Sequence, residues 1–191
     1  MSKGLKLSDI LVTVLIAVVF AIIYNIWNFV YNALQVTGLH LEELSYGMWF
    51  MAAVVAYLII PKPGIAVLAE FAAGAGETIV MGRFDIPTMI YGLLQGLACE
   101  IIFAIFRYQS RSAMVAMLAG LLAAVVTLPL DFAYGYLAEI AGWNLALYIG
   151  FRLISGIVVA GLASYYIVKA LDKTGVTKLF RQSSRSDYDN L

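Results

Sequence analysis

The sequence is poor in charge and in cysteine. Only 13% of its 191 residues are charged, while 63% are hydrophobic and the mean hydropathy is +0.91. A soluble domain of this length needs far more charge to cover its surface, so the composition excludes that class. The single cysteine, Cys99, excludes a disulfide framework and a cysteine-based metal site. Lipid is therefore the expected solvent.

Motifs for nucleotide hydrolysis and for common catalytic chemistry are also absent. The sequence has no GxxxxGK[ST] phosphate-binding loop, no HExxH motif and no Ser, His or Cys constellation. The chain is therefore not expected to hydrolyse ATP by itself, to act as an enzyme, or to hold a cofactor or a metal ion. A small intramembrane enzyme is an alternative from another class, but it would need a catalytic constellation that these residues do not supply.

Long apolar runs fill most of the chain. A membrane-spanning helix needs roughly 20 mostly apolar residues, so this length holds about six spans with short loops. We expect them at 9–34, 46–60, 65–81, 88–108, 113–137 and 145–171. The turn Pro61-Lys62-Pro63-Gly64 ends the second run, because proline cannot continue a helix. The prediction is an all-α membrane protein, a bundle of six transmembrane helices over 1–172, with a polar cytoplasmic tail over 173–191.

The basic residues collect on one side of this predicted bundle. Ten of the twelve fall at the amino terminus, in alternate loops or in the tail: Lys3, Lys6, Lys62, Arg107, Arg111, Lys169, Lys173, Lys178, Arg181 and Arg185. Arg83 lies in a loop on the other side, and Arg152 lies inside the last span. Because cytoplasmic loops carry an excess of Lys and Arg, both termini are predicted to be cytoplasmic.

Polar side chains gather in the outer half of the predicted bundle. On the first helix, Tyr24, Trp27, Asn28 and Tyr31 follow the i, i+3, i+4, i+7 spacing of one face. Acids and one base lie within the other spans: Glu77, Asp131 and Arg152 in their outer halves, Glu100 nearer the midplane, and Glu70 closer to the cytoplasm. A charge in the hydrocarbon costs about 2.5 to 3.5 kcal/mol, so several retained together indicate a functional site.

We expect these residues to line an outward-facing cavity of negative charge. Carboxylates with aromatic faces suit a flat organic cation, through ion pairing and stacking. Glu77 and Glu100 would hold the cation or an amine. The predicted binding residues are Glu77, Glu100, Gln95, Tyr91, Asn28, Tyr31, Trp27, Trp49, Asp131, Tyr134 and Glu70.

Structural interpretations of the same residues stay open. Arg152 could neutralise Asp131 or Glu139 in a structural pair, and Glu70 could face an inner vestibule or another subunit. Tryptophan and tyrosine near an interface often only anchor a helix in the membrane. The outer-loop residues His40, Glu42 and Glu43 are expected to be solvated, and the alternative for the two acids is that they attract a cation electrostatically.

Several segments resemble the substrate-binding S components of energy-coupling factor (ECF) vitamin transporters, in particular the YkoE type. They are the Ala-x-x-x-Ala motif of Ala17-Val18-Val19-Phe20-Ala21, the Pro61-Lys62-Pro63-Gly64 turn, Glu70-Phe71-Ala72-Ala73-Gly74 and Tyr91-Gly92-Leu93-Leu94-Gln95-Gly96. The resemblance covers all the predicted spans but not the tail.

The resemblance implies a subunit of an importer in the plasma membrane of a prokaryote. It would capture thiamine or its hydroxymethylpyrimidine precursor outside, and would work with a transmembrane coupling subunit and two cytoplasmic ATPases. Ala17 and Ala21 would dock on the coupling subunit, and no nucleic acid partner is implied. The rival hypothesis is a stand-alone carrier that couples a small organic cation to protons through Glu70, Glu77 and Asp131.

Overall fold

The computed structural model describes residues 4–36, 38–82, 84–137, 140 and 142–177, and all secondary structure among them is helical. The elements are α1 (Leu7–Gln35), the 3-10 helix η1 (Leu41–Phe50), α2 (Met51–Ile59), α3 (Ile65–Val80), α4 (Ile86–Ile105), α5 (Ala113–Ala133), α6 (Trp143–Ser155), the π-helix η2 (Gly156–Ala163) and α7 (Ser164–Thr174). The predicted all-α class is confirmed. The last 14 residues of the predicted tail, 178–191, lie outside the described residues.

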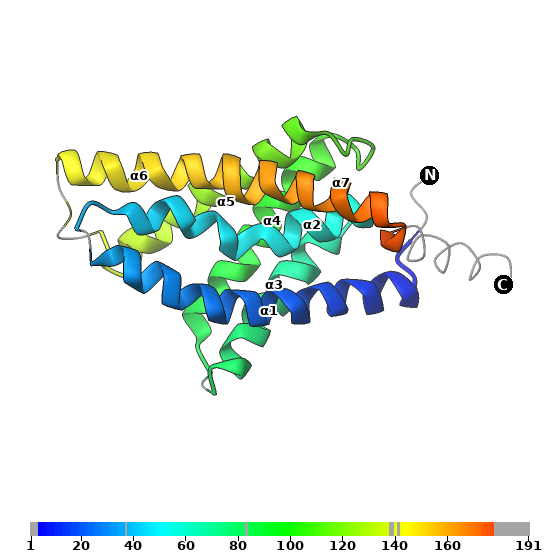
Figure 1. Cartoon of the computed structure of the whole chain (residues 1–191), viewed down its shortest axis with the longest axis horizontal. Coiled ribbons are helices and arrows are strands. Elements are labelled where there is room, and N and C mark those ends of the chain that lie inside the picture. Colours follow the sequence, from blue (N-terminus) through cyan, green and yellow to red (C-terminus); the bar gives the residue numbers. More distant parts are fainter. Residues whose placement is uncertain (1–3, 37, 83, 138–139, 141, 178–191) are drawn as a thin grey trace, which may run out of the picture.

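The helices form one bundle with α2 near its centre (Figure 1). α1 runs along one side, α6, η2 and α7 continue one another along the opposite side, and α3, α4 and α5 cross between them at an angle. Among the described residues, four helical stretches are long and apolar enough to span a membrane: Leu7–Gln35, Ile86–Ile105, Ala113–Ala133 and Trp143–Thr174. The start of α1 and the end of α7 lie at the same end of the molecule.

The second predicted span differs most from the expected helix. It begins as η1 at Leu41 and becomes α-helical only at Met51. All nine residues of α2 are buried among the other helices. Its unbroken apolar sequence therefore fills the protein core instead of facing lipid. Because other helices surround it, this helix does not need the length of a full membrane span and is only about 14 Å long.

Local signals set several helix ends. Gly64 has a φ of +85° immediately before α3, a conformation that suits glycine after the proline turn. The side chain of Asp85 caps α4 by accepting a hydrogen bond from the backbone N–H of Thr88 at 3.1 Å. Ser112 caps α5 in the same way through the N–H of Val115 at 3.3 Å.

Small residues bring α1 against α3. Ala17 and Ala21 are 1% and 3% exposed, and a Cβ atom on Gly76 would lie 2.8 Å from that of Ala21. The exposed face of α1 carries larger apolar side chains, including Val18 and Ile22. The structure thus places the Ala-x-x-x-Ala motif inside the bundle, because the polar face of the same helix also points inward. A partner could reach it only if α1 separated from α3.

The crossing of α5 and η2 depends on glycine. A Cβ atom added to Gly120 would clash with the backbone oxygen of Gly156, and one added to Gly156 would clash with the backbone of Gly120. Small residues allow such close approach of membrane helices.

We expect Gly120→Ala to lower the stability of the detergent-purified protein by about 1–3 kcal/mol, because the added methyl group overpacks this crossing. Thermal unfolding measures the effect. Gly150→Ala is the matched control, since a Cβ atom at Gly150 meets nothing within 4 Å. Equal melting temperatures for the two variants would contradict this description of the crossing.

Candidate binding site

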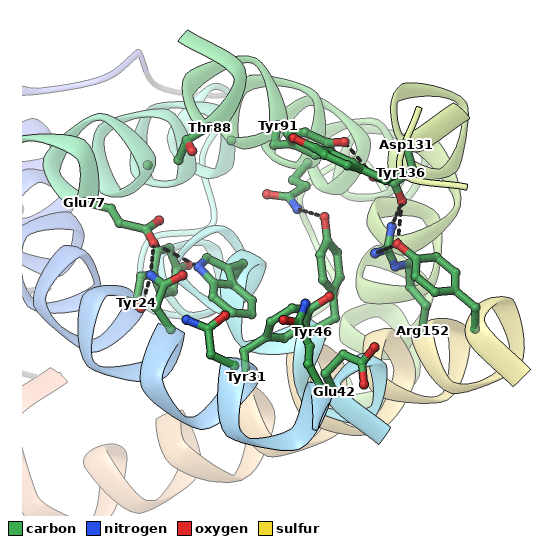
Figure 2. A pocket seen from close by; sticks show the side chains of 18 of the residues that line it. Tyr24, Tyr31, Glu42, Tyr46, Glu77, Thr88, Tyr91, Asp131, Tyr136 and Arg152 are labelled. Carbon is green, nitrogen blue, oxygen red and sulfur yellow. Dashed lines mark hydrogen bonds and ion pairs between the residues drawn. The ribbon is translucent and has the colours of Figure 1, made fainter. Parts of the chain in front are cut away.

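A cavity of about 590 Å³ lies among α1, η1, α3, α4, α5 and α6 (Figure 2). Its volume is in the range of sites for small organic molecules. Eight of the eleven predicted binding residues line it: Asn28, Tyr31, Trp49, Glu70, Glu77, Tyr91, Gln95 and Asp131. Of the described residues that line it, four are acids and one is an arginine, so the formal charge of this described wall is negative.

Glu77 of α3 is held on the cavity wall by neutral donors from two other elements. The side-chain amide of Asn28 donates to Glu77 Oε1 at 2.7 Å, and the indole N–H of Trp49 donates to the same oxygen at 3.1 Å. The Tyr31 ring meets the Trp49 ring edge-on, with centroids 5.1 Å apart. α1, η1 and α3 together therefore present a carboxylate beside aromatic faces.

Glu70, two helical turns before Glu77 on α3, is only 1% exposed. Its carboxylate accepts a hydrogen bond from the Tyr24 hydroxyl at 3.0 Å and one from the backbone N–H of Ala53 at 2.9 Å. The Tyr24 hydroxyl also accepts from the backbone N–H of Ala52. Glu70 therefore ties α1 and α2 to α3 while forming part of the cavity wall.

Arg152 stands on the opposite side of the cavity from Glu77 (Figure 2). Its guanidinium pairs with Glu43 at 2.6 Å and with Asp131, and it donates to the Tyr148 hydroxyl at 2.5 Å. It also lies 3.7 Å from the centre of the Tyr46 ring, a cation–π distance. The pairing of Arg152 with Asp131 is the structural alternative considered from the sequence, and Glu139 lies outside the described residues.

Comparisons with known proteins agree with this architecture. Residues 8–126 match the family model described as "ABC-type cobalt transport system, permease component". YkoE of Bacillus subtilis (strain 168), named as an HMP/thiamine permease protein, is 34% identical over 176 residues, which cover 91% of this chain and 88% of YkoE. A crystal structure of an S component of an ECF transporter matches with a TM-score of 0.84 and 30% identity, over 98% of this chain and 99% of that one.

The chain belongs to the S components of ECF transporters. Its likeness within that family is to the YkoE type, as the sequence segments predicted. It is accordingly a transport protein of the prokaryotic plasma membrane and not an enzyme. Among the residues that the structure describes, no group of three or more His, Cys, Asp or Glu side chains is placed to hold a metal ion.

Three predicted binding residues of this S component do not line the cavity. Glu100 accepts hydrogen bonds from the backbone N–H groups of Gly64 at 2.6 Å and Ala66 at 3.1 Å, so it caps α3 at the other end of the bundle. Trp27 donates its indole N–H to the backbone oxygen of Ser45 at 3.1 Å. Tyr134 is 39% exposed just after α5.

Other lining residues of the S component were not predicted as binding residues: His40, Glu42, Tyr46, Tyr148 and Arg152 among them. The expectation that the outer loop is solvated was wrong for its acids, since Glu42 and Glu43 are 6% and 0% exposed. η1 folds this segment against α6 instead of leaving it in solvent. One sequence signal could have predicted a buried acid in this segment, because an arginine within a span requires buried acidic partners.

Proposed function

We propose that this S component binds thiamine or its hydroxymethylpyrimidine precursor in the cavity and delivers it for ATP-driven uptake. The observation that carries the proposal is the Glu77 carboxylate held between Asn28 and Trp49 on an aromatic wall. Thiamine combines a permanently cationic thiazolium with a flat aminopyrimidine. The carboxylate can balance its charge, and the tyrosine and tryptophan rings can stack on its rings.

The side chains that line the cavity also support a ring-containing organic ligand. Tyr91 and Gln95 of α4 line the cavity, and Gln95 donates to the hydroxyl of Tyr46, a residue of η1, at 3.4 Å. Tyr46 and Trp49 of η1 lie with ring centroids 5.9 Å apart. Aromatic rings together with hydrogen-bonding groups suit a heterocycle with polar substituents. The name of the relative YkoE points to the same ligands.

The proposed topology has six crossings: α1, η1 with α2, α3, α4, α5, and α6 with η2 and α7. The start of α1 and the end of α7 lie at one end of the bundle, as an even number of crossings requires. The bias of basic residues assigns that end to the cytoplasm. The cavity then opens outward, where the ligand is captured, and the tail from 173 onward lies in the cytoplasm.

Uptake would require a transmembrane coupling subunit and two cytoplasmic ATPases, because the sequence has no phosphate-binding loop of its own. We propose that Ala17 and Ala21 meet the coupling subunit after α1 moves away from α3.

Reconstitution in proteoliposomes tests the proposed function. Labelled thiamine is expected to accumulate only when the coupling subunit, both ATPases and ATP are present with this chain. A complex without ATP and the chain alone serve as controls. Accumulation by the chain alone under a pH gradient would contradict the proposal and indicate the proton-coupled carrier instead.

A further inference from the structure

Among the described residues that line the cavity, one is an arginine, and it is engaged by other side chains of the protein. Arg152 is 1% exposed, pairs with Glu43 and Asp131, and lies over the Tyr46 ring. Its two carboxylate partners outweigh its single positive charge. Arginine is the usual receptor for phosphate groups, because its N–H fork matches their oxygens. In this cavity the guanidinium N–H groups of Arg152 already bond to Glu43, Asp131 and Tyr148.

A second feature of the wall that could bind an anion, the N-terminus of α4, is also occupied by a side chain of the protein. Thr88, in the first turn of α4, lines the cavity, and a helix N-terminus ordinarily favours an anion. The carboxylate of Asp85 accepts hydrogen bonds from both the backbone N–H and the hydroxyl of Thr88. An anionic ligand would have to displace this carboxylate.

Glu42 adds a negative charge to the cavity wall, where it would interact with a bound ligand. Its side chain lines the cavity and is 6% exposed. One oxygen, Oε1, lies 3.3 Å from His40 Nδ1, whereas Oε2 has no hydrogen-bond partner among the described residues. A ligand N–H could satisfy this oxygen, but a phosphate oxygen would be repelled by it.

From this arrangement we propose that the cavity rejects phosphate esters of its ligand. Glu43 and Asp131 act as specificity-determining residues because they occupy Arg152, and Glu42 does so because it adds negative charge to the wall. The inference rests on the proposed function and deepens it. A phosphate monoester adds about −1.5 to −2 charges at neutral pH, which turns a cationic ligand into an anionic one. The four lining acids would then oppose the ligand that they otherwise attract.

A consequence concerns the reaction that precedes uptake. Phosphorylated forms outside the cell would have to be hydrolysed first, by an enzyme that transfers the phosphoryl group to water and leaves the free alcohol and inorganic phosphate. The class of reaction that supplies this substrate is therefore phosphomonoester hydrolysis.

Fluorescence titrations of the purified full-length chain with thiamine and with thiamine monophosphate, at equal ionic strength, test the inference. The wild-type chain is expected to bind thiamine at least about 100-fold more tightly. Asp131→Asn removes the charge of one of the two ion pairs of Arg152, and Glu42→Gln removes another negative charge, so each should narrow this affinity ratio by about tenfold. Asp172→Asn makes the same kind of change in the last turns of α7, outside this cavity, and should leave the ratio unchanged.

The outcomes separate this inference from the proposed function. Wild-type binding of the monophosphate within about threefold of thiamine would overturn the rejection of phosphate esters while the proposed function stands. An unchanged ratio in both cavity variants would overturn the roles of these residues, and Glu42→Gln keeps that test valid if Asp131→Asn does not fold. A chain that binds neither thiamine nor hydroxymethylpyrimidine would overturn the proposed function and this inference together.

Discussion

Glu77→Gln is expected to weaken thiamine binding by about 10- to 150-fold. The substitution keeps the shape of the side chain but removes the negative charge that, in the proposed complex, would face the thiazolium. A hydrogen bond or ion pair to a charged group is worth about 1.5–3 kcal/mol, and 1.4 kcal/mol corresponds to a tenfold change in affinity. Because Trp49 donates to Glu77, quenching of tryptophan fluorescence reports binding at this wall.

Glu100→Gln is the matched control for that variant. It makes the same chemical change in a glutamate that caps α3 and does not line the cavity. Its thiamine affinity should equal that of the wild-type chain, while its melting temperature falls modestly because a helix cap is weakened. Wild-type affinity in Glu77→Gln, or an equal loss in both variants, would show that the binding site is not at Glu77.

Arg152→Met is expected to cause the largest loss of stability, about 3–5 kcal/mol. The substitution leaves the carboxylates of Glu43 and Asp131 buried without their cation, and both side chains are nearly inaccessible to solvent. Thermal unfolding in detergent measures the loss.

A triple variant distinguishes the loss of charge balance from the loss of packing. Combining Arg152→Met with Glu43→Gln and Asp131→Asn removes all three charges, so much of the stability should return. If Arg152→Met alone is as stable as the wild-type chain, or if the triple variant is less stable than the single one, the charge-balance explanation is contradicted.

The polar face of α1 shows what helical periodicity can predict. Tyr24, Asn28 and Tyr31 lie on the cavity as their spacing indicated, whereas Trp27, on the edge of the same stripe, turns to Ser45. Periodicity predicts, to within about one residue, which face of a helix points inward. The neighbouring element decides which residues at the edge of that face line the cavity. The inward position of Ala17 and Ala21 follows from the same periodicity, since they continue that stripe.

Glu100 shows the limit of assigning function from depth alone. The sequence places it on α4 within the membrane, but Gln95 and Glu100 point to different sides of that helix. Gln95 lines the cavity and Glu100 reaches the start of α3. Choosing between these sides requires knowing which helix packs on which, and that is a property of the whole fold.

The outer segment 41–50 could not be placed from local sequence. Its acids and its glycine are typical of a solvated loop, yet Glu43 meets an arginine 109 positions away. The backbone N–H of Gly47 donates to the Ser155 hydroxyl at 2.7 Å, and a Cβ atom there would clash with the backbone of Ser155. Long-range contacts of this kind leave no periodic signal, so Glu42 and Tyr46 of this segment were missed as lining residues.

The central claim is that this cavity binds thiamine or its hydroxymethylpyrimidine precursor, and calorimetric titration of the purified chain tests it most directly. Thiamine and hydroxymethylpyrimidine would each be titrated in the absence of any partner subunit. We predict saturable binding of one ligand per chain, with submicromolar affinity for at least one of the two compounds. No binding of either compound at millimolar concentration would contradict the account.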